Sequence, residues 1–472
     1  MPVRLRSFST AGAAIVAAAL FGAVLVGVVS GRDPLFGVAA AIALPLLVLM
    51  IAQLMLGLCV MTLFAFLESL STLDRLSLAK LVGLVLAVSW LAVVTSGRRD
   101  ARNLLSERPG LSYVVVLFLG WAAISITWAP VRGDATASIM RYVLNALLIP
   151  IAFTALRDRR DATRLLAVIV AGATVAAITG IISAPAGGAD ATRATGTVGD
   201  ANQLAAALLI GACVAAAFAV NRHIAVPWRL AAAGSTGLCL LGILLSLSRG
   251  GLLGLAGAIV VAIVVAGRWR PQVIAFALAT AVAAIGYFAL FASLPAKERV
   301  TNVGGGTGRL DLWTVGWRMV EAHPTRGVGT GQFQTASVHY LLRPGAIQRG
   351  DFILSTPKVA HNTYLNILAE LGVIGGVLFA GIVLFSVGCM HLAARELHRR
   401  GDEGFEILVR GLLTGVGGYL VTLMFISENY SKLLWVVLAL GPAVLATVRA
   451  PRDRAPAEAA RPPGAAVAAA PS

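Results

Sequence analysis

The chain has 472 residues, of which 58% are hydrophobic and 13% are charged. A soluble protein of this composition, with a mean hydropathy of +0.85, could not cover its core with polar surface, so that class is excluded. The net charge of +16 is spread over short segments between apolar runs, which is typical of a membrane protein and not of one that binds nucleic acid.

Apolar runs of about 16–22 residues, the length that spans a bilayer as a helix, recur along the chain. Helices satisfy their own backbone hydrogen bonds in lipid, so we predict an all-α, polytopic transmembrane helical bundle of about 12–14 spans. Only Gln53 separates the second and third runs, but one helix across both would overshoot the bilayer. The predicted spans cover residues 13–29, 35–51, 53–67, 78–95, 112–127, 137–154, 163–182, 202–220, 228–246, 251–266, 272–291, 361–389, 407–426 and 431–447.

The distribution of arginine predicts the orientation of these spans. Segments on one side carry two to four arginines each, as in 157–164 and 395–400, whereas the short loops on the other side carry about one. Basic residues concentrate on the cytoplasmic side of membrane proteins. We therefore expect a multi-pass protein of the inner (plasma) membrane with both termini in the cytoplasm.

We divide the chain into three parts. Residues 1–192 form an N-terminal transmembrane bundle, residues 193–447 form a second membrane domain, and the tail 448–472, rich in Ala, Pro and Arg, is expected to be disordered. The second domain contains one long extracytoplasmic loop between late spans, residues 292–360. Its eight basic and four acidic residues give a net charge of +4, which suits an anionic ligand.

Three polar clusters fall on the predicted outer side. The first is TGTVGDANQ at 195–203, the second is SRGG at 248–251, and the third is the long loop from Gly308 and Arg309 to its exit at His361. Polar clusters that converge on one face of a helical bundle are typical of a ligand site. We therefore expect the functional site at this end.

Each polar candidate also has a structural alternative. The Arg249 guanidinium offers a planar fork of donors suited to a pyrophosphate, although the side chain could instead extend to lipid phosphates. Asp200 could orient a hydroxyl, but Asp200 and Asn202 are also good helix caps. Leu310, Trp313, Trp317 and Val320 fall on one face of a short helix, which we expect to lie in the plane of the membrane interface.

His361 stands where the polar loop meets an apolar helix. A helix that begins at His361 brings Leu365 and Gly372 to one side, and the glycines at 372–376 suit the close approach of another helix. Neighbouring arginines should lower the pKa of the imidazole and favour its neutral form. The alternative is that His361 caps the helix.

We expect neither a metal ion nor another cofactor. The six histidines are scattered, and the sequence has no CxxC pair. The glycine run at 304–308 lacks the GK[ST] ending of a nucleotide-binding loop.

Four segments of the chain resemble the O-antigen ligase and polymerase superfamily of bacterial membrane glycan transferases. They are RATGTVGDANQLA at 193–205, SRGGLLGL at 248–255, TGRLDLWTVGWRMVEAHPTRGVGTGQF at 307–333 and HNTYLNILAELGVIGG at 361–376. The last contains the ligase pattern of a His, a small polar residue, and glycines at the matching spacing. The long loop before the His also agrees.

The resemblance implies a metal-independent glycosyltransferase that acts on polyprenyl-diphosphate glycans. It assigns the diphosphate to arginines, here Arg249 and Arg309, and a proton-accepting or orienting role to the loop His, here His361. With Asp200, these are the expected catalytic residues. The expected substrate-binding residues are Arg193, Asn202, Asn362, Trp313 and Trp317.

We therefore expect transfer of a glycan from a polyprenyl-diphosphate donor to an acceptor hydroxyl, on a glycan or a lipid, at the outer face. One alternative is a polymerase that extends the lipid-linked glycan itself. A second is a glycan or lipid transporter, but transporters usually place ionisable groups near the bilayer midplane, which is nearly uncharged here.

Overall fold

The computed structural model describes residues 41, 45–68, 72–73, 76–96, 102–184, 193–301, 308–341 and 358–450. The predicted span 13–29, most of the span 35–51, and residues 451–472 of the predicted tail lie outside these ranges. Within them the chain is almost entirely helical. One short antiparallel pair, β1 (Thr72–Leu73) with β2 (Leu76–Ser77), is the exception.

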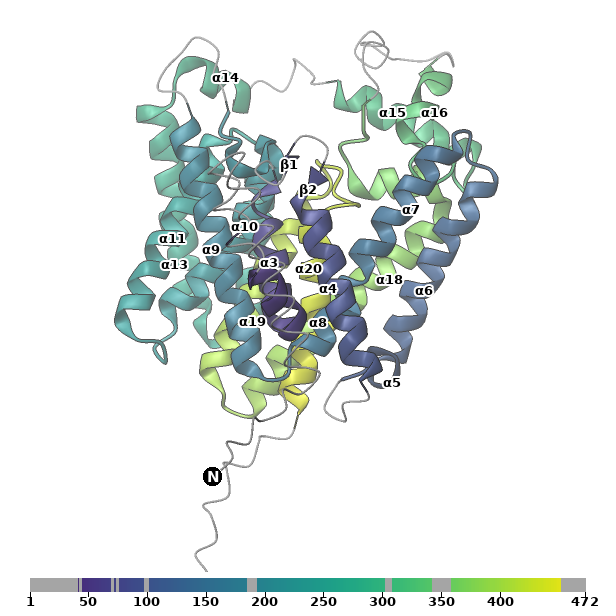
Figure 1. Ribbon diagram of the computed structural model, residues 1–472. Coiled ribbons are helices and arrows are strands. Elements are labelled where there is room, and N and C mark those ends of the chain that lie inside the picture. Colours follow the sequence, from purple (N-terminus) through teal and green to yellow (C-terminus); the bar gives the residue numbers. More distant parts are fainter. Residues whose placement is uncertain are drawn as a thin grey trace, which may run out of the picture.

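The helices form a polytopic bundle, as the hydropathy predicts (Figure 1). In the described ranges, nine helical stretches are long and apolar enough to cross a membrane. They are α6 (Pro109–Ile124) with η2 (Ser125–Thr127), α7 (Arg132–Ala146) with α8 (Leu148–Ala155), α9 (Arg159–Ser183), α10 (Ala201–Val220), α11 (Val226–Leu245), η4 (Gly267–Trp269) with α13 (Arg270–Gly286) and η5 (Tyr287–Phe291), α18 (Thr363–Arg399), α19 (Glu403–Thr422) and α20 (Lys432–Arg449). Shorter apolar helices are α3 (Leu54–Phe64), α4 (Leu78–Thr95) and α12 (Arg249–Val265).

Two helices form the centre of the bundle. Nearly every residue of α20 is buried, and α20 packs against α8 and α18. Helix α10 packs against α9, α11 and α19. Small residues permit this close packing, because a Cβ atom at Gly211 would overlap Ala173 of α9. Helices from before and after residue 193 therefore share one interior.

Helix α18 is broken near its start, which corrects the expectation of one continuous helix from His361. The helix begins at Thr363, and Gly372 has φ +65° and ψ −170°, outside the helical region. A Cβ atom at Gly372 would overlap the backbone of Thr325 and Arg326. A loop, and not another helix, therefore approaches this glycine.

The loop at residues 323–333, here called the docked loop, enters this break. The amides of Val328 and Gly329 donate to the carbonyls of Ala369 and Glu370 at 2.9 and 2.8 Å. On the other side of the break, the Val373 amide donates to the Pro324 carbonyl at 2.8 Å. The docked loop thus satisfies backbone groups that the interrupted helix leaves without partners.

Two short helices flank the docked loop at one end of the bundle, at the top of Figure 1. They are α15 (Arg309–Ala322) and α16 (Phe333–Leu341). Leu312, Val315 and Met319 of α15 are buried in a cluster with Phe333 and residues of the first half of α18. This cluster and the docked loop place α15 beside the start of α18.

Candidate functional site

The first two predicted polar clusters are joined by direct hydrogen bonds. Arg193 donates through Nη2 to Asn202 Oδ1 at 2.7 Å and through Nε to the Ser246 carbonyl at 2.9 Å. Ser248 Oγ donates to the same Asn202 oxygen at 3.0 Å. Asn202 therefore connects the segment before α10 to the start of α12.

The same residues cap both helices. Asp200 Oδ1 accepts the amides of Asn202 and Gln203 at 2.8 and 3.0 Å, so the capping alternative for Asp200 is correct as a local role. The Ser248 hydroxyl caps α12 by accepting the Gly251 amide at 3.1 Å. Arg249, which is half-buried, is thus the first residue of a capped helix.

His361 has an unusual backbone conformation. Among the described residues, two non-glycine residues have positive φ, Leu247 at +49° and His361 at +48°. Each lies directly before a helix cap of the candidate site, namely Ser248 and Asn362. Such strain persists only where the surrounding structure holds it, and it is common at functional sites.

The capping role proposed as the alternative for His361 belongs to its neighbour. Asn362 Oδ1 accepts the Leu365 amide at 3.1 Å, and α18 begins at Thr363. Asn362 was expected to bind substrate, and this contact gives it a structural role as well. The His361 imidazole remains available for other chemistry.

Charged groups surround the His361 imidazole. Its pKa is lowered first by burial and then by Arg309 and Lys358, while Asp200 acts in the opposite direction. Arginine was expected to lower this pKa, and burial is the larger cause. Arg309 and Asp200, from different predicted clusters, are therefore both near enough to His361 to act on its charge.

Two contacts hold α15 next to His361. Trp313 Nε1 donates to the carbonyl of Ala360 at 3.1 Å, and the Trp313 ring lies 6.2 Å from the Phe425 ring. Arg309 begins this helix after Gly308, whose φ of +69° suits glycine. The anchored tryptophan thus positions the arginine at the opposite end of the same turn.

An apolar groove of about 690 Å³ leads away from Asn362 between α15 and α18. Trp313 and Trp317 line it, and Arg318 and Glu321 also border it. The prediction that four apolar residues share one face of α15 was partly wrong. Leu310 and Trp317 are 70% and 55% exposed, whereas Val320 is buried on the other side of the helix. The helix packs through its other side onto α16 and α18, so its exposed apolar residues face the groove. The remaining residues that line the groove are Leu310, Thr314, Tyr364, Leu365, Leu368 and Met424.

The segment between α19 and α20 was missed by sequence reasoning. Thr363 donates from its amide to the Leu423 carbonyl at 2.8 Å and from its hydroxyl to the Ile426 carbonyl at 2.7 Å. Glu428 is buried, and its side chain forms hydrogen bonds with Ser431 and Gln203. Burial raises the pKa of Glu428 to about 7. The signal in the sequence is the polar stretch SENYSK between the last two apolar runs.

Glu370 holds the docked loop in place. This carboxylate is 3% exposed and accepts the amides of Gly331 at 2.9 Å and Phe333 at 3.2 Å. The Tyr430 hydroxyl donates to it at 3.2 Å. Glu370 therefore acts as a packed polar residue that fixes the docked loop to α18.

These contacts bring together cations, a neutral imidazole and an apolar groove. Guanidinium groups can bind a phosphate, the imidazole can accept a proton, and the groove can hold an apolar chain. In the described part of the chain, His, Cys, Asp and Glu side chains nowhere gather in threes as a metal site would require.

Comparison with known proteins gives one family. Residues 234–380 match the family model described as O-antigen ligase, and no curated protein matches the chain. The matched segment contains Arg249, Arg309 and His361, and it ends beyond the break in α18. Its family processes glycans at membranes, in agreement with the helical bundle. The match over residues 234–380 thus supports a relationship of this part of the chain to the O-antigen ligase superfamily.

Proposed function

We propose that the protein transfers a glycan from a polyprenyl-diphosphate donor to an acceptor hydroxyl on the outer face of the inner membrane. The observation that supports this proposal is that Arg309 and Asp200 both act on the charge of His361, whose neighbour Asn362 lines an apolar groove. A diphosphate on an isoprenoid chain presents the two matching chemistries, an anionic head and an apolar tail.

In this reaction the arginines act on the leaving group. Arg249 and Arg309 bind the diphosphate through charge-assisted hydrogen bonds and stabilise the negative charge that grows as the glycosidic C–O bond breaks. They thereby take the role that a divalent cation has in other glycosyltransferases. The isoprenoid chain follows the groove along Trp313 and Trp317.

His361 acts on the acceptor. Its neutral imidazole accepts the hydroxyl proton while the oxygen attacks the anomeric carbon, and Asp200 helps to orient the hydroxyl. Attack from the side opposite the diphosphate inverts the configuration at that carbon. Arg193 and Asn202, which are joined by a hydrogen bond, and Asn362 complete the proposed substrate contacts.

Reconstitution in nanodiscs tests this function. Purified protein receives a lipid-linked oligosaccharide and a separate acceptor, and the products are analysed for glycan length and anomeric configuration. We expect an acceptor-linked product of inverted configuration. Extension of the lipid-linked chain in place of the acceptor would instead identify a polymerase, and loss of both products would reject a glycosyltransferase.

The same assay tests the role of the arginines. With EDTA present we expect unchanged transfer, since guanidinium groups stabilise the diphosphate. Activity that disappears with EDTA and returns with Mg²⁺ would contradict this role.

A further inference from the structure

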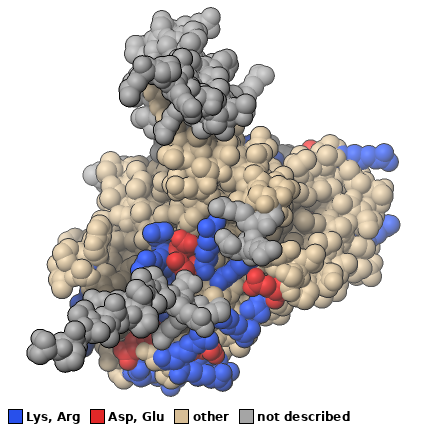
Figure 2. All heavy atoms as spheres, turned by 60° about the horizontal axis from the view of Figure 1, so that its bottom comes forward, with Lys and Arg blue, Asp and Glu red and all other residues tan. Residues whose placement is uncertain are grey.

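A second hollow lies at the end of the bundle opposite the candidate site. It measures about 750 Å³ and is bordered by the start of α9, the turn at residues 221–224, and residues 401–408 at the start of α19. Figure 2 shows this face of the molecule, on which Lys and Arg side chains gather with fewer carboxylates among them. The arginine distribution predicts that this end faces the cytoplasm.

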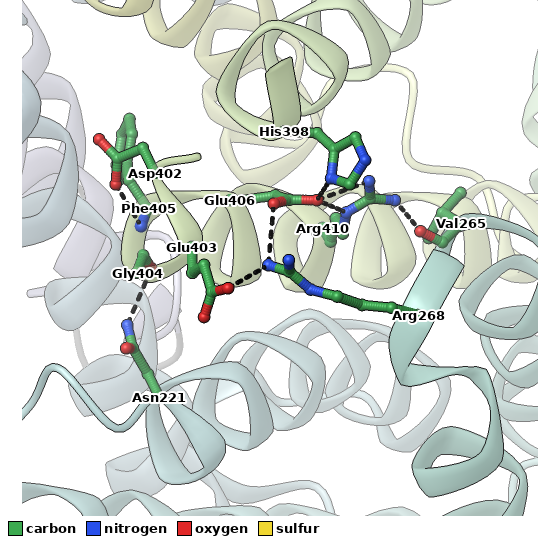
Figure 3. Close-up of polar contacts among 10 residues, drawn as sticks. All are labelled: Asn221, Val265, Arg268, His398, Asp402, Glu403, Gly404, Phe405, Glu406 and Arg410. Atoms are coloured by element: carbon green, nitrogen blue, oxygen red, sulfur yellow. Dashed lines mark hydrogen bonds and ion pairs between the residues drawn. The ribbon is translucent and has the colours of Figure 1, made fainter. Parts of the chain in front are cut away.

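The carboxylates that border this hollow are engaged with other groups. Asp402 forms an ion pair with Arg159 and accepts the Phe405 amide at 3.3 Å. Glu403 turns toward Arg268, which is not among the lining residues, and pairs with it at 3.0 Å (Figure 3). Among the described residues, the ion-pair partners of Asp402 and Glu403 are thus Arg159 and Arg268, and not the other basic residues that line the hollow.

Three basic side chains of the hollow have weak or no partners. Among the described residues, the side chains of Arg160 and His223 form no hydrogen bond or ion pair. Arg164 pairs with Asp161 at 3.1 Å, but the Arg164 side chain is 68% exposed, and exposed pairs of this kind contribute little. The hollow therefore offers two guanidinium groups and an imidazole to a ligand.

The turn that carries His223 is held in place. Asn221 donates through Nδ2 to the Gly404 carbonyl at 2.8 Å, as Figure 3 shows, and its Oδ1 accepts the His223 amide at 3.1 Å. The imidazole packs so closely on Gly404 that a Cβ atom there would crowd it. The turn that carries His223 is thus fixed to the start of α19, to which the Arg159–Asp402 ion pair also joins α9.

We propose that this hollow binds a phosphate group through Arg160, Arg164 and His223. Guanidinium forks match phosphate oxygens, and basic pockets between helices at the cytoplasmic boundary are suited to the head groups of anionic lipids. A lipid phosphate and a soluble phosphate ester share this chemistry. The site is separate from the proposed glycan transfer and does not depend on it.

Native mass spectrometry tests the proposal with two probes. Purified protein in detergent is titrated with phosphatidylglycerol, with phosphatidylcholine as the zwitterionic comparison, and separately with inorganic pyrophosphate in the absence of lipid. We expect binding of at least one anionic probe that weakens about tenfold or more in the Arg160→Gln, Arg164→Gln double variant, as the loss of charge-assisted hydrogen bonds predicts. The probe that shows this loss identifies the source of the phosphate.

Arg222→Gln is the matched control, because Arg222 is exposed in the same turn but does not line the hollow. We expect it to bind both probes as the wild type does. His223→Gln, made on its own, should weaken binding as well, and thermal unfolding checks that every variant is folded. Equal losses in Arg222→Gln and the double variant, or anion binding unchanged in the double variant, would overturn the proposal.

Discussion

At the scale of single residues, the backbone of His361 is the least expected feature. A left-handed conformation costs a non-glycine residue about 1–2 kcal/mol, and here it turns the chain between the long loop and α18. The cost is offset by the contacts of Thr363 and Asn362 immediately after it. Arg309 and Asp200 both act on the charge of this residue, so we propose that the strained conformation serves the candidate site.

Two substitutions of His361 distinguish its two possible roles, as a general base or as a group that orients the acceptor. We expect His361→Ala to insert and to bind the donor lipid normally but to transfer glycan ~10²–10⁴-fold more slowly, the usual contribution of a general base. His361→Gln keeps hydrogen bonding without accepting a proton. If initial rates show that Gln restores most of the activity, His361 orients the acceptor; wild-type rates in both variants would reject the site.

The pH profile of the reaction follows from the lowered pKa of His361. Burial and Arg309 disfavour the protonated imidazole, so the base stays neutral to a lower pH than the ordinary value of 6.5 allows. We therefore expect kcat/KM to be constant near neutral pH and to fall only below pH 6.5. His361 also binds a proton more weakly in the folded than in the unfolded state. Its contribution to the free energy of unfolding therefore decreases as the pH falls below 6.5. An acid limb above pH 6.5 would contradict the assignment of His361 as the base.

Arg249 should not tolerate lysine. Lysine keeps the charge but lacks the planar fork, so one of two contacts to a diphosphate is lost. A charge-assisted hydrogen bond contributes ~1.5–3 kcal/mol, and we expect Arg249→Lys to transfer glycan roughly ten- to a hundredfold more slowly. Arg132→Lys, at an exposed arginine that begins α7, should retain wild-type rates. Full activity in Arg249→Lys would indicate a lipid-facing side chain.

At the scale of elements, the break in α18 and the docked loop determine where the site residues lie. The first half of α18 follows His361, and the docked loop continues from α15, which begins with Arg309. The hydrogen bonds between the loop and the break therefore set the position of one site residue relative to the other.

Glu370 is the side chain with which this arrangement can be tested. Glu370→Gln replaces an acceptor of two loop amides by a group that can accept them with only one oxygen. We expect faster hydrogen exchange in residues 328–333 and a lower kcat, with donor binding retained. Glu406→Gln, at an equally buried carboxylate of α19 near the opposite end, should leave both measurements unchanged. Equal effects of the two substitutions would show a general loss of stability.

Sequence reasoning named the candidate residues but not the way they connect. Asn202 and His361 stand at the starts of apolar runs, where a polar residue is conspicuous and helix direction decides which end of the bundle it reaches. The docked loop and Glu428 depend on contacts between segments far apart in the chain, which no local pattern encodes. Gly372 was noticed, but its φ of +65° is set by the loop that enters beside it.

At the scale of the whole molecule, the two ends differ in chemistry, and the arginine distribution predicts which one faces outward. The test uses exposed positions at opposite ends, Thr335 in α16 and Arg222 between α10 and α11. The four native cysteines are buried or half-buried, so they should react slowly with a maleimide. In intact cells, a membrane-impermeant maleimide should label Thr335→Cys and should label Arg222→Cys only after permeabilisation. The reverse pattern would place Arg309 and His361 in the cytoplasm, where a transfer on the outer face could not occur, and would move the phosphate-binding hollow to the outer leaflet.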